Sequence, residues 1–237
     1  MTPLVLLPGL LCDAEVWAAQ TAGLADVADC RVADLTRDDS MSGMAARVLK
    51  EAPSGRFALA GFSMGGYVAF EIMRQAPDRV MRLALLGTSA RTDSGERREE
   101  RRRFIELARR PRRFMPITRA MLGMLVHPSR TREEALTKPI IDMAARVGVQ
   151  AYIRQQVAML DRPDSVADLR GIRCPTLVLA GREDGRAPPA VQEEIRDGIE
   201  GAELVILENC GHMAPMERPE LVNGAMRRWL SSPAGGA

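Results

Sequence analysis

Strand-like apolar runs alternate with helical patterns along most of this chain. The runs lie near residues 4–7, 29–34, 56–60, 80–87, 175–180 and 203–207. Apolar positions recur at helical spacing near residues 16–25, 42–51, 65–75 and 217–230. Strands that alternate with helices predict a parallel sheet covered on both faces. We therefore expect an α/β fold with a mostly parallel sheet of about six strands.

Residues 90–165 interrupt this alternation. They carry helical patterns and almost no strand signal, so we expect a helical insertion there. The flanking stretches, residues 1–89 and 166–237, then form one core domain. A chain of 237 residues is long enough to bury one substantial core, which suits a single α/β domain with an insert.

The insertion begins with an arginine-rich segment, residues 91–113, in which glutamates are interleaved. In one interpretation this segment is a solvated helix whose apolar side chains turn inward, namely Phe104, Ile105, Leu107 and Ala108. In the other, the arginines form a basic mouth that attracts carboxylate substrates. We favour the first interpretation, because charged runs usually form solvated faces.

Bulk properties exclude several classes of function. The formal net charge of +2 indicates neither a nucleic-acid partner nor an acidic one. No apolar stretch reaches about 18 residues, and Met1-Thr2-Pro3 leads directly into a strand, so we expect neither a transmembrane helix nor an export signal. The four cysteines are widely spaced and lack metal-ligand pairing. We therefore expect a cytoplasmic protein with reduced thiols and with no metal or cofactor.

The segment Gly61-Phe62-Ser63-Met64-Gly65-Gly66 connects a predicted strand to a predicted helix. Ser63 then lies on a sharp, strained turn, and its neighbours two residues away must be small to avoid collisions of Cβ atoms. The helix start behind it supplies free N–H groups and a positive dipole end, which suit a developing oxyanion. The pattern predicts a serine nucleophile, which needs a base and an acid from elsewhere in the chain.

The chain has two histidines, so the candidates for the base are few. His212 follows the strand-like run 203–207, and the glycine before it and the prolines after it indicate a loop. Loops at the carboxyl ends of parallel strands are where such sheets place their sites. His127 lies in a helical, methionine-rich region, where we expect a surface or capping residue. We predict His212 as the base.

The acid is predicted at the end of another buried strand. The apolar run 174–180 ends in Gly181-Arg182-Glu183-Asp184-Gly185. An aspartate in this position can hold the histidine ring in the right tautomer. Glu183 competes for the role, but adjacent side chains diverge on a turn and only one can face the site. We favour Asp184.

The order Ser63, Asp184, His212 along the chain resembles that of the α/β-hydrolases, and the chain is similar to their small, capped carboxylesterases. The resemblance covers residues 3–231 and rests on the Ser63 motif, on 181–184 and on Gly211-His212. It implies that the insertion 90–165 forms a helical cap over the nucleophile. The family's usual N-terminal antiparallel hairpin has no counterpart here, so we expect a trimmed sheet.

The resemblance also implies an oxyanion hole. In the family, the loop after the first parallel strand gives one backbone N–H donor, which by position is that of Leu10. The second donor is the N–H of Met64, the residue after the nucleophile. The family usually has a histidine before the loop glycine, whereas this chain has Pro8, whose stiffness can serve the same purpose.

The insertion should also shape the substrate pocket. Its inner side is rich in methionine and other apolar residues, which adapt to varied shapes. We expect substrate contacts from Leu11, Met121, Leu125 and Met213. With few polar residues there, we expect a small to medium apolar or aromatic acyl group.

Together these features predict a serine esterase that acts on a small-molecule ester through an acyl-enzyme, as a monomer or homodimer. Carbon–carbon bond, lactone or thioester hydrolysis and cofactor-free perhydrolysis use the same triad and remain open. A ligand-binding protein of the same fold with slow turnover is a further alternative. Epoxide hydrolases and haloalkane dehalogenases are disfavoured, because they have an aspartate as the nucleophile.

Overall fold

A computed structural model of the chain describes residues 1–110, 117 and 119–232. Within these residues, six strands form one sheet of order β2-β1-β3-β4-β5-β6, in which every neighbouring pair is parallel. The strands are β1 (Thr2–Leu7), β2 (Ala28–Val32), β3 (Phe57–Phe62), β4 (Val80–Leu86), β5 (Thr176–Gly181) and β6 (Glu203–Leu207). Their positions confirm the predicted α/β fold and its six-stranded sheet.

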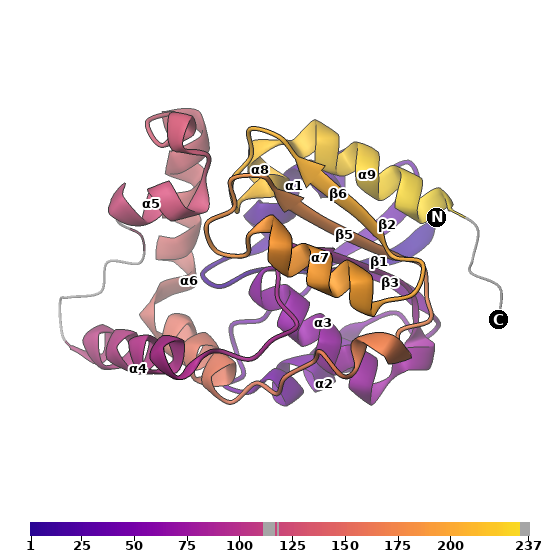
Figure 1. Cartoon of the computed structure of the whole chain (residues 1–237), viewed down its shortest axis with the longest axis horizontal. Coiled ribbons are helices and arrows are strands. Elements are labelled where there is room, and N and C mark those ends of the chain that lie inside the picture. Colours follow the sequence, from indigo (N-terminus) through magenta and orange to yellow (C-terminus); the bar gives the residue numbers. More distant parts are fainter. Residues whose placement is uncertain (111–116, 118, 233–237) are drawn as a thin grey trace.

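Helices cover both faces of this sheet (Figure 1). One face carries α2 (Met41–Glu51), α3 (Met64–Gln75) and α7 (Pro189–Gly198), and the other carries α1 (Ala18–Gly23), α8 (Ala214–Glu217) and α9 (Pro219–Ser231). The apolar spacing did not predict α7. Its two buried side chains are Ile195 and the polar Gln192.

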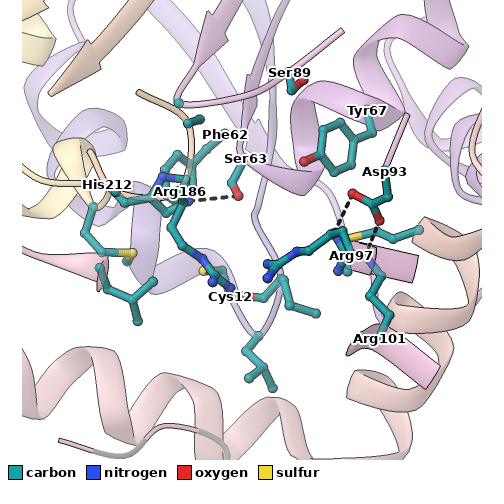
Figure 2. A pocket seen from close by; sticks show the side chains of 18 of the residues that line it. Cys12, Phe62, Ser63, Tyr67, Ser89, Asp93, Arg97, Arg101, Arg186 and His212 are labelled. Carbon is teal, nitrogen blue, oxygen red and sulfur yellow. Dashed lines mark hydrogen bonds and ion pairs between the residues drawn. The ribbon is translucent and has the colours of Figure 1, made fainter. Parts of the chain in front are cut away.

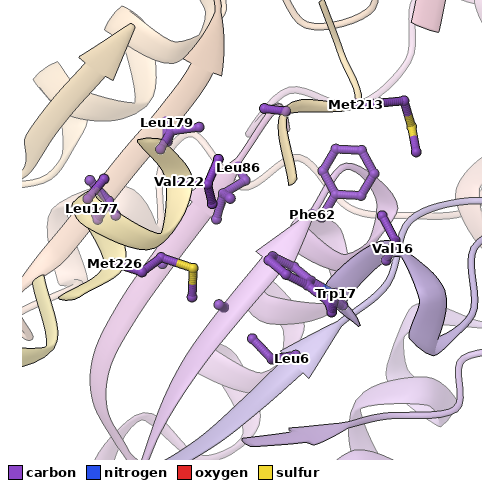
Figure 3. Close-up of a cluster of buried hydrophobic side chains, with 14 of the residues drawn as sticks. Leu6, Val16, Trp17, Phe62, Leu86, Leu177, Leu179, Met213, Val222 and Met226 are labelled. Atoms are coloured by element: carbon purple, nitrogen blue, oxygen red, sulfur yellow. The ribbon is translucent and has the colours of Figure 1, made fainter. Parts of the chain in front are cut away.

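The side chains of each strand alternate between two buried clusters, one on each face of the sheet. In β1, Leu4 and Leu6 join one cluster, while the neighbouring Val5 and Leu7 join the other. Figure 3 shows part of the first cluster, where Trp17 packs edge-on against Phe62. Burying one large apolar side chain contributes about 1.5–3 kcal/mol. These clusters therefore hold the strand ends, and the loops that follow them, in fixed positions.

Three helices stand together beside the carboxyl ends of the strands (Figure 1). They are α4 (Gly95–Arg109), α5 (Arg119–Leu125) and α6 (Glu134–Leu160), and α4 packs against α6. A break at Gly148, whose φ is 76°, interrupts α6. These helices come from the insertion predicted at residues 90–165.

Helix α4 departs from the expected solvated helix in two respects. Leu107 was expected to turn inward but is 43% exposed, and the charged Arg101 is buried instead. Ile105 and Ala108 are buried as expected. The end of the arginine-rich segment, residues 111–113, lies outside the described residues.

In the described part of the chain, none of the helices combines the length and the apolar character that a membrane span requires.

Candidate active site

Ser63 occupies the turn between β3 and α3, with φ 52° and ψ −115°. This left-handed conformation is strained for a residue with a side chain. Three hydrogen bonds hold it: its N–H donates to the Leu86 carbonyl at 2.9 Å, and its carbonyl accepts from Thr88 Oγ1 at 2.8 Å and from the Gly66 N–H at 2.9 Å. These bonds to the end of β4 and to the start of α3 therefore hold Ser63 in its strained conformation.

The glycines around Ser63 are required by close backbone contacts. A Cβ on Gly61 would lie 2.5 Å from the Gly65 carbonyl oxygen, and a Cβ on Gly65 would lie 2.2 Å from the carbonyl oxygen of Leu7. Neither distance leaves room for a side chain. The spacing of the motif thus reflects the tight packing of the turn against β1 and α3.

His212 lies between Ser63 and Asp184. Its Nε2 is 2.9 Å from Ser63 Oγ, and its Nδ1 is 2.8 Å from Asp184 Oδ2. A carboxylate can only accept, so the Nδ1 carries the proton and Nε2 is free to accept from the Ser63 hydroxyl. The side chain of Asp184 is fully buried and that of His212 is 6% exposed. The structure therefore brings the three predicted side chains into one hydrogen-bonded chain.

The alternative candidates for the acid and the base, Glu183 and His127, make other contacts. Glu183 accepts a hydrogen bond from the Cys210 N–H at 2.9 Å and its side chain is 32% exposed. The ring of His127 contacts Ser129, with Nδ1 2.7 Å from its hydroxyl oxygen. The other oxygen of Asp184, Oδ1, accepts from two backbone N–H groups of its own loop, at 2.7 and 2.9 Å. Asp184 is thereby fixed toward His212.

A buried glutamate, Glu217, orients the loop that carries His212. Its two carboxylate oxygens accept the Gly211 N–H at 3.0 Å and the His127 N–H at 2.8 Å. Burial raises the pKa of Glu217, against the lowering effect of these hydrogen bonds. The sequence analysis did not single out Glu217, because its role depends on contacts between loops.

The loop after β1 carries the predicted oxyanion donor Leu10. Leu11 has φ 58°, and its N–H donates to Oε1 of Gln155 at 3.1 Å. Gln155 comes from α6, is completely buried, and also donates from Nε2 to the Leu35 carbonyl at 3.1 Å. Met64 begins α3, and an N–H in a first helical turn has no partner within its helix. Leu10 lines the same cavity as Ser63.

A cavity of about 540 Å³ opens beside Ser63 and His212 (Figure 2). The four predicted substrate contacts, Leu11, Met121, Leu125 and Met213, all line it. Further apolar walls come from Leu10, Phe62, Ile117, Ile140, Met143 and Met159. This part of the lining is apolar, and it lies in the same cavity as Ser63.

The expectation of few polar residues does not hold for this cavity. Its lining includes five arginines, together with hydroxyl side chains: Arg91, Arg97, Arg101, Arg162, Arg186, Tyr67, Ser89, Thr92 and Ser94. Arg97 and Arg101 belong to the arginine-rich helix, so part of its charge faces the cavity rather than solvent. The sequence signal for this was the basic run itself, in the interpretation that we did not favour.

Asp93 pairs with two of these arginines and balances one of their two positive charges. It forms an ion pair with Arg101 and another with Arg162, whose Nη2 is 2.9 Å from Asp93 Oδ1. Burial alone would raise the pKa of Asp93, but the hydrogen bonds and charges of the two arginines outweigh it and lower the pKa to about 2. The guanidinium of Arg162 also lies 4.1 Å from the centre of the Tyr67 ring.

The cysteines near the site are poor nucleophiles. Burial raises the pKa of Cys12, which lines the cavity, to about 12, and has the same effect on Cys210. Among the residues that the structure describes, no group of three or more histidine, cysteine, aspartate or glutamate side chains is arranged to hold a metal ion.

Comparisons with known proteins agree with this fold. A model of the alpha/beta hydrolase family matches residues 4–225. An AB hydrolase superfamily protein, YisY, of Bacillus subtilis is 32% identical over 182 residues, which are 73% of this chain and 66% of that relative. A 2-hydroxy-6-oxononadienedioate/2-hydroxy-6-oxononatrienedioate hydrolase of Paraburkholderia phymatum is 30% identical over 201 residues, or 81% of this chain and 69% of that one.

Among solved structures, a thermophilic esterase from Thermogutta terrifontis superposes with a TM-score of 0.86 and 32% identity, covering 97% of this chain and 89% of that one. The match to the family model over nearly the whole sequence, with the parallel sheet and the loops at its carboxyl edge, places this chain in the alpha/beta hydrolase family.

Proposed function

We propose that the protein hydrolyses a carboxylic ester through an acyl-enzyme on Ser63. The hydrogen-bonded chain from Ser63 through His212 to Asp184, open to a cavity at the Ser63 end, is the observation that carries the proposal. A serine hydroxyl becomes a useful nucleophile only when an adjacent base takes its proton. His212 is within hydrogen-bond distance to do so.

In the proposed reaction, Ser63 Oγ bonds to the carbonyl carbon while its proton passes to Nε2 of His212. Asp184 stabilises the resulting imidazolium. The tetrahedral intermediate then breaks its bond to the alcohol oxygen, which takes the proton from His212. A water molecule, deprotonated by His212, attacks the acyl-enzyme, and release of the acid regenerates Ser63.

The backbone N–H groups of Leu10 and Met64 are the proposed donors to the oxyanion. Both residues adjoin Ser63 at the carboxyl edge of the sheet, one after β1 and one at the start of α3. Removal of one such donor typically costs about 2.7–4 kcal/mol of transition-state stabilisation. The helices at residues 90–165 are proposed to act as the cap, because α4, α5 and α6 supply much of the cavity wall.

The acyl group is proposed to lie along the apolar wall formed by Leu11, Met121, Leu125 and Met213. A cavity of about 540 Å³ suits a small to medium acyl group. Similarity to the Thermogutta terrifontis esterase supports ester cleavage. Hydrolysis of a carbon–carbon bond is the second candidate, because the Paraburkholderia phymatum hydrolase is similar over 81% of this chain.

The test is covalent labelling followed by kinetics. A p-nitrophenyl phosphonate should add one phosphonyl group to Ser63, as detected by mass spectrometry of peptides. Ser63→Ala and His212→Ala should each lower the hydrolysis of p-nitrophenyl acetate by roughly a thousandfold or more. His127→Ala is the matched control, because its ring contacts Ser129 rather than Ser63, and it should retain activity. Unlabelled Ser63, or hydrolysis that persists in Ser63→Ala, would refute the proposal.

A further inference from the structure

Arg186 lies two residues after Asp184, on the loop that follows β5. Its backbone N–H donates to Asp184 Oδ1 at 2.7 Å, so its position is tied to the acid of the proposed triad. Its side chain lines the cavity together with Ser63 and His212. In Figure 2 the Arg186 side chain extends from the Ser63–His212 side, while Arg97, Arg101 and Asp93 lie on the opposite side.

The guanidinium of Arg186 forms no direct ion pair in the part of the chain that the structure describes. Within the described ranges, no carboxylate or carbonyl accepts a hydrogen bond from it, whereas Arg101 and Arg162 share Asp93. Burial lowers the pKa of Arg186, and the positive charges of Arg97 and Arg101 lower it further, whereas the negative charge of Glu100, which is paired with Arg97, acts in the opposite direction. A partly buried guanidinium still keeps its proton, so the free protein holds a positive charge without a direct partner in the same cavity as its proposed nucleophile.

Arg97 brings a second positive charge to the same cavity. It comes from α4 and forms an ion pair with Glu100 of its own helix, whose side chain is 43% exposed. That pair lies partly in solvent and is therefore weak. Hydroxyl groups of Ser89 and Ser94 line the same cavity. The cavity thus combines an apolar wall with a cationic region.

We propose that Arg186, assisted by Arg97, binds a free carboxylate carried by the ester substrate. This inference deepens the proposed function and rests on it for the reaction at Ser63. The substrate class would be monoesters of dicarboxylic acids, or esters of similar length with one ionised carboxylate. The planar guanidinium matches a carboxylate with two parallel hydrogen bonds, and the anion supplies the direct ion-pair partner that Arg186 lacks.

The position of Arg186 also makes the recognition selective. An anion bound there must share the cavity with the ester carbonyl at Ser63, so an apolar chain is needed to connect the two groups. Leu11, Met121 and Leu125 provide the wall along which that chain can lie. A neutral ester fills the same wall but leaves the guanidinium unpaired, which loses the strong, charge-assisted part of the interaction.

The experiment compares two substrate series. One contains monomethyl esters of dicarboxylic acids of graded chain length, and the other contains the same esters with the free carboxylate replaced by a primary amide. At the best chain length, the wild type should hydrolyse the carboxylate substrate with a kcat/KM roughly 10- to 150-fold higher than that of the matching amide, as expected for hydrogen bonds to a charged group. Arg186→Gln should bring this ratio close to one, and Arg97→Gln should reduce it by a smaller factor.

Arg102→Gln is the matched control. It removes the same charge from α4, but Arg102 is exposed, pairs with Glu99 and is absent from the cavity wall. The ratio should be unchanged in this variant. Arg186→Lys tests the geometry, since a point charge cannot form the paired hydrogen bonds, and it should recover only part of the ratio. Thermal unfolding confirms that each variant is folded, and if Arg186→Gln is not, Arg186→Lys and Arg97→Gln decide.

Binding separates failure of this inference from failure of the proposed function. Calorimetry should show that the monoesters bind to Ser63→Ala. Their affinity should be lower for Ser63→Ala/Arg186→Gln, by a factor similar to the fall in the carboxylate-to-amide ratio of kcat/KM that Arg186→Gln causes. If the wild type hydrolyses no ester, the proposed function fails, and this binding comparison still decides the subsite. Equal rates for carboxylate and amide at every chain length, or a ratio that survives Arg186→Gln, would overturn the inference.

Discussion

Single buried side chains from distant parts of the sequence hold the loops around Ser63. Gln155 joins α6 to the loop after β1 and to the Leu35 carbonyl, and Glu217 joins the loop of His212 to that of His127. Each side chain satisfies two buried backbone groups at once. Such groups are costly to leave unpaired, so these two residues fix the site without touching the proposed substrate position.

We predict that Gln155→Leu slows the proposed reaction and destabilises the fold. The change leaves the Leu11 N–H and the Leu35 carbonyl without partners, at about 1–3 kcal/mol for each group. The loop of Leu10 should lose its alignment, so that kcat falls more than KM rises. The measurement is steady-state kinetics with a neutral ester, together with urea unfolding.

Gln156→Leu provides the control for that prediction. Gln156 is the next residue of α6, is equally part of the buried interior, and accepts from Arg101 Nη1 at 2.8 Å instead of holding the loop. It should lower stability with a much smaller effect on kcat. If both variants reduce kcat by the same factor, Gln155 acts only through stability.

At the scale of elements, the link between α4 and α6 depends on a buried ion cluster. Asp93 precedes α4 and pairs with Arg101 on α4 and Arg162 just after α6. All three side chains are nearly inaccessible, with exposed fractions of 7%, 7% and 4%. Removing Asp93 would leave two buried guanidinium groups without their shared carboxylate, which makes the cluster a strong restraint on the position of α4.

This cluster predicts a particular dependence of stability on pH. The pKa of Asp93 is about 2 in the folded protein, below its ordinary value of 3.8, so its contribution is complete above pH 4 and is lost as pH falls toward 2. The difference in unfolding free energy between wild type and Asp93→Asn should therefore shrink by about 1 kcal/mol between pH 6 and pH 3. Urea unfolding at a series of pH values measures this difference.

Asp26→Asn is the comparison for the cluster. Asp26 pairs with Arg227 on the surface, where its side chain is 64% exposed and solvent screens the interaction. The difference in unfolding free energy between wild type and Asp26→Asn should be small from pH 6 to pH 3. If the difference in unfolding free energy between wild type and Asp93→Asn stays constant from pH 6 to pH 3, the role assigned to the cluster is contradicted.

The sequence was most informative where local pattern determines structure. Apolar runs located all six strands, and the strand–turn–helix motif with two strand-exit loops predicted three side chains that lie together in the structure, Ser63, Asp184 and His212. It could not identify Gln155, whose bond to Leu11 spans 144 positions in the chain. Helical periodicity also could not show that Arg101 faces inward, because burial of an arginine requires its acid, Asp93, to be placed by the fold.

For the molecule as a whole, the sheet and helix α4 beside its carboxyl edge differ in how much of their surface is buried. All six residues of β3 are buried, and α3 packs seven of its residues into the interior. Within α4, by contrast, only Arg101, Ile105 and Ala108 are buried. Free energies of local opening follow buried apolar contacts, so the cavity lies between a stable wall and a less stable one.

Hydrogen exchange should therefore separate the two walls. We predict that amides in β3 and α3 exchange only through global unfolding, while those in α4 exchange through local opening and hence much faster. Mass spectrometry of exchanged peptides measures both in one experiment, and α3 serves as the internal control for a helix of similar length. Asp93→Asn should speed exchange in α4 without a matching change in β3, because the cluster restrains α4 in particular. Equal protection of α4 and β3 would contradict this prediction and would mean that the two elements open together, as one cooperative unit.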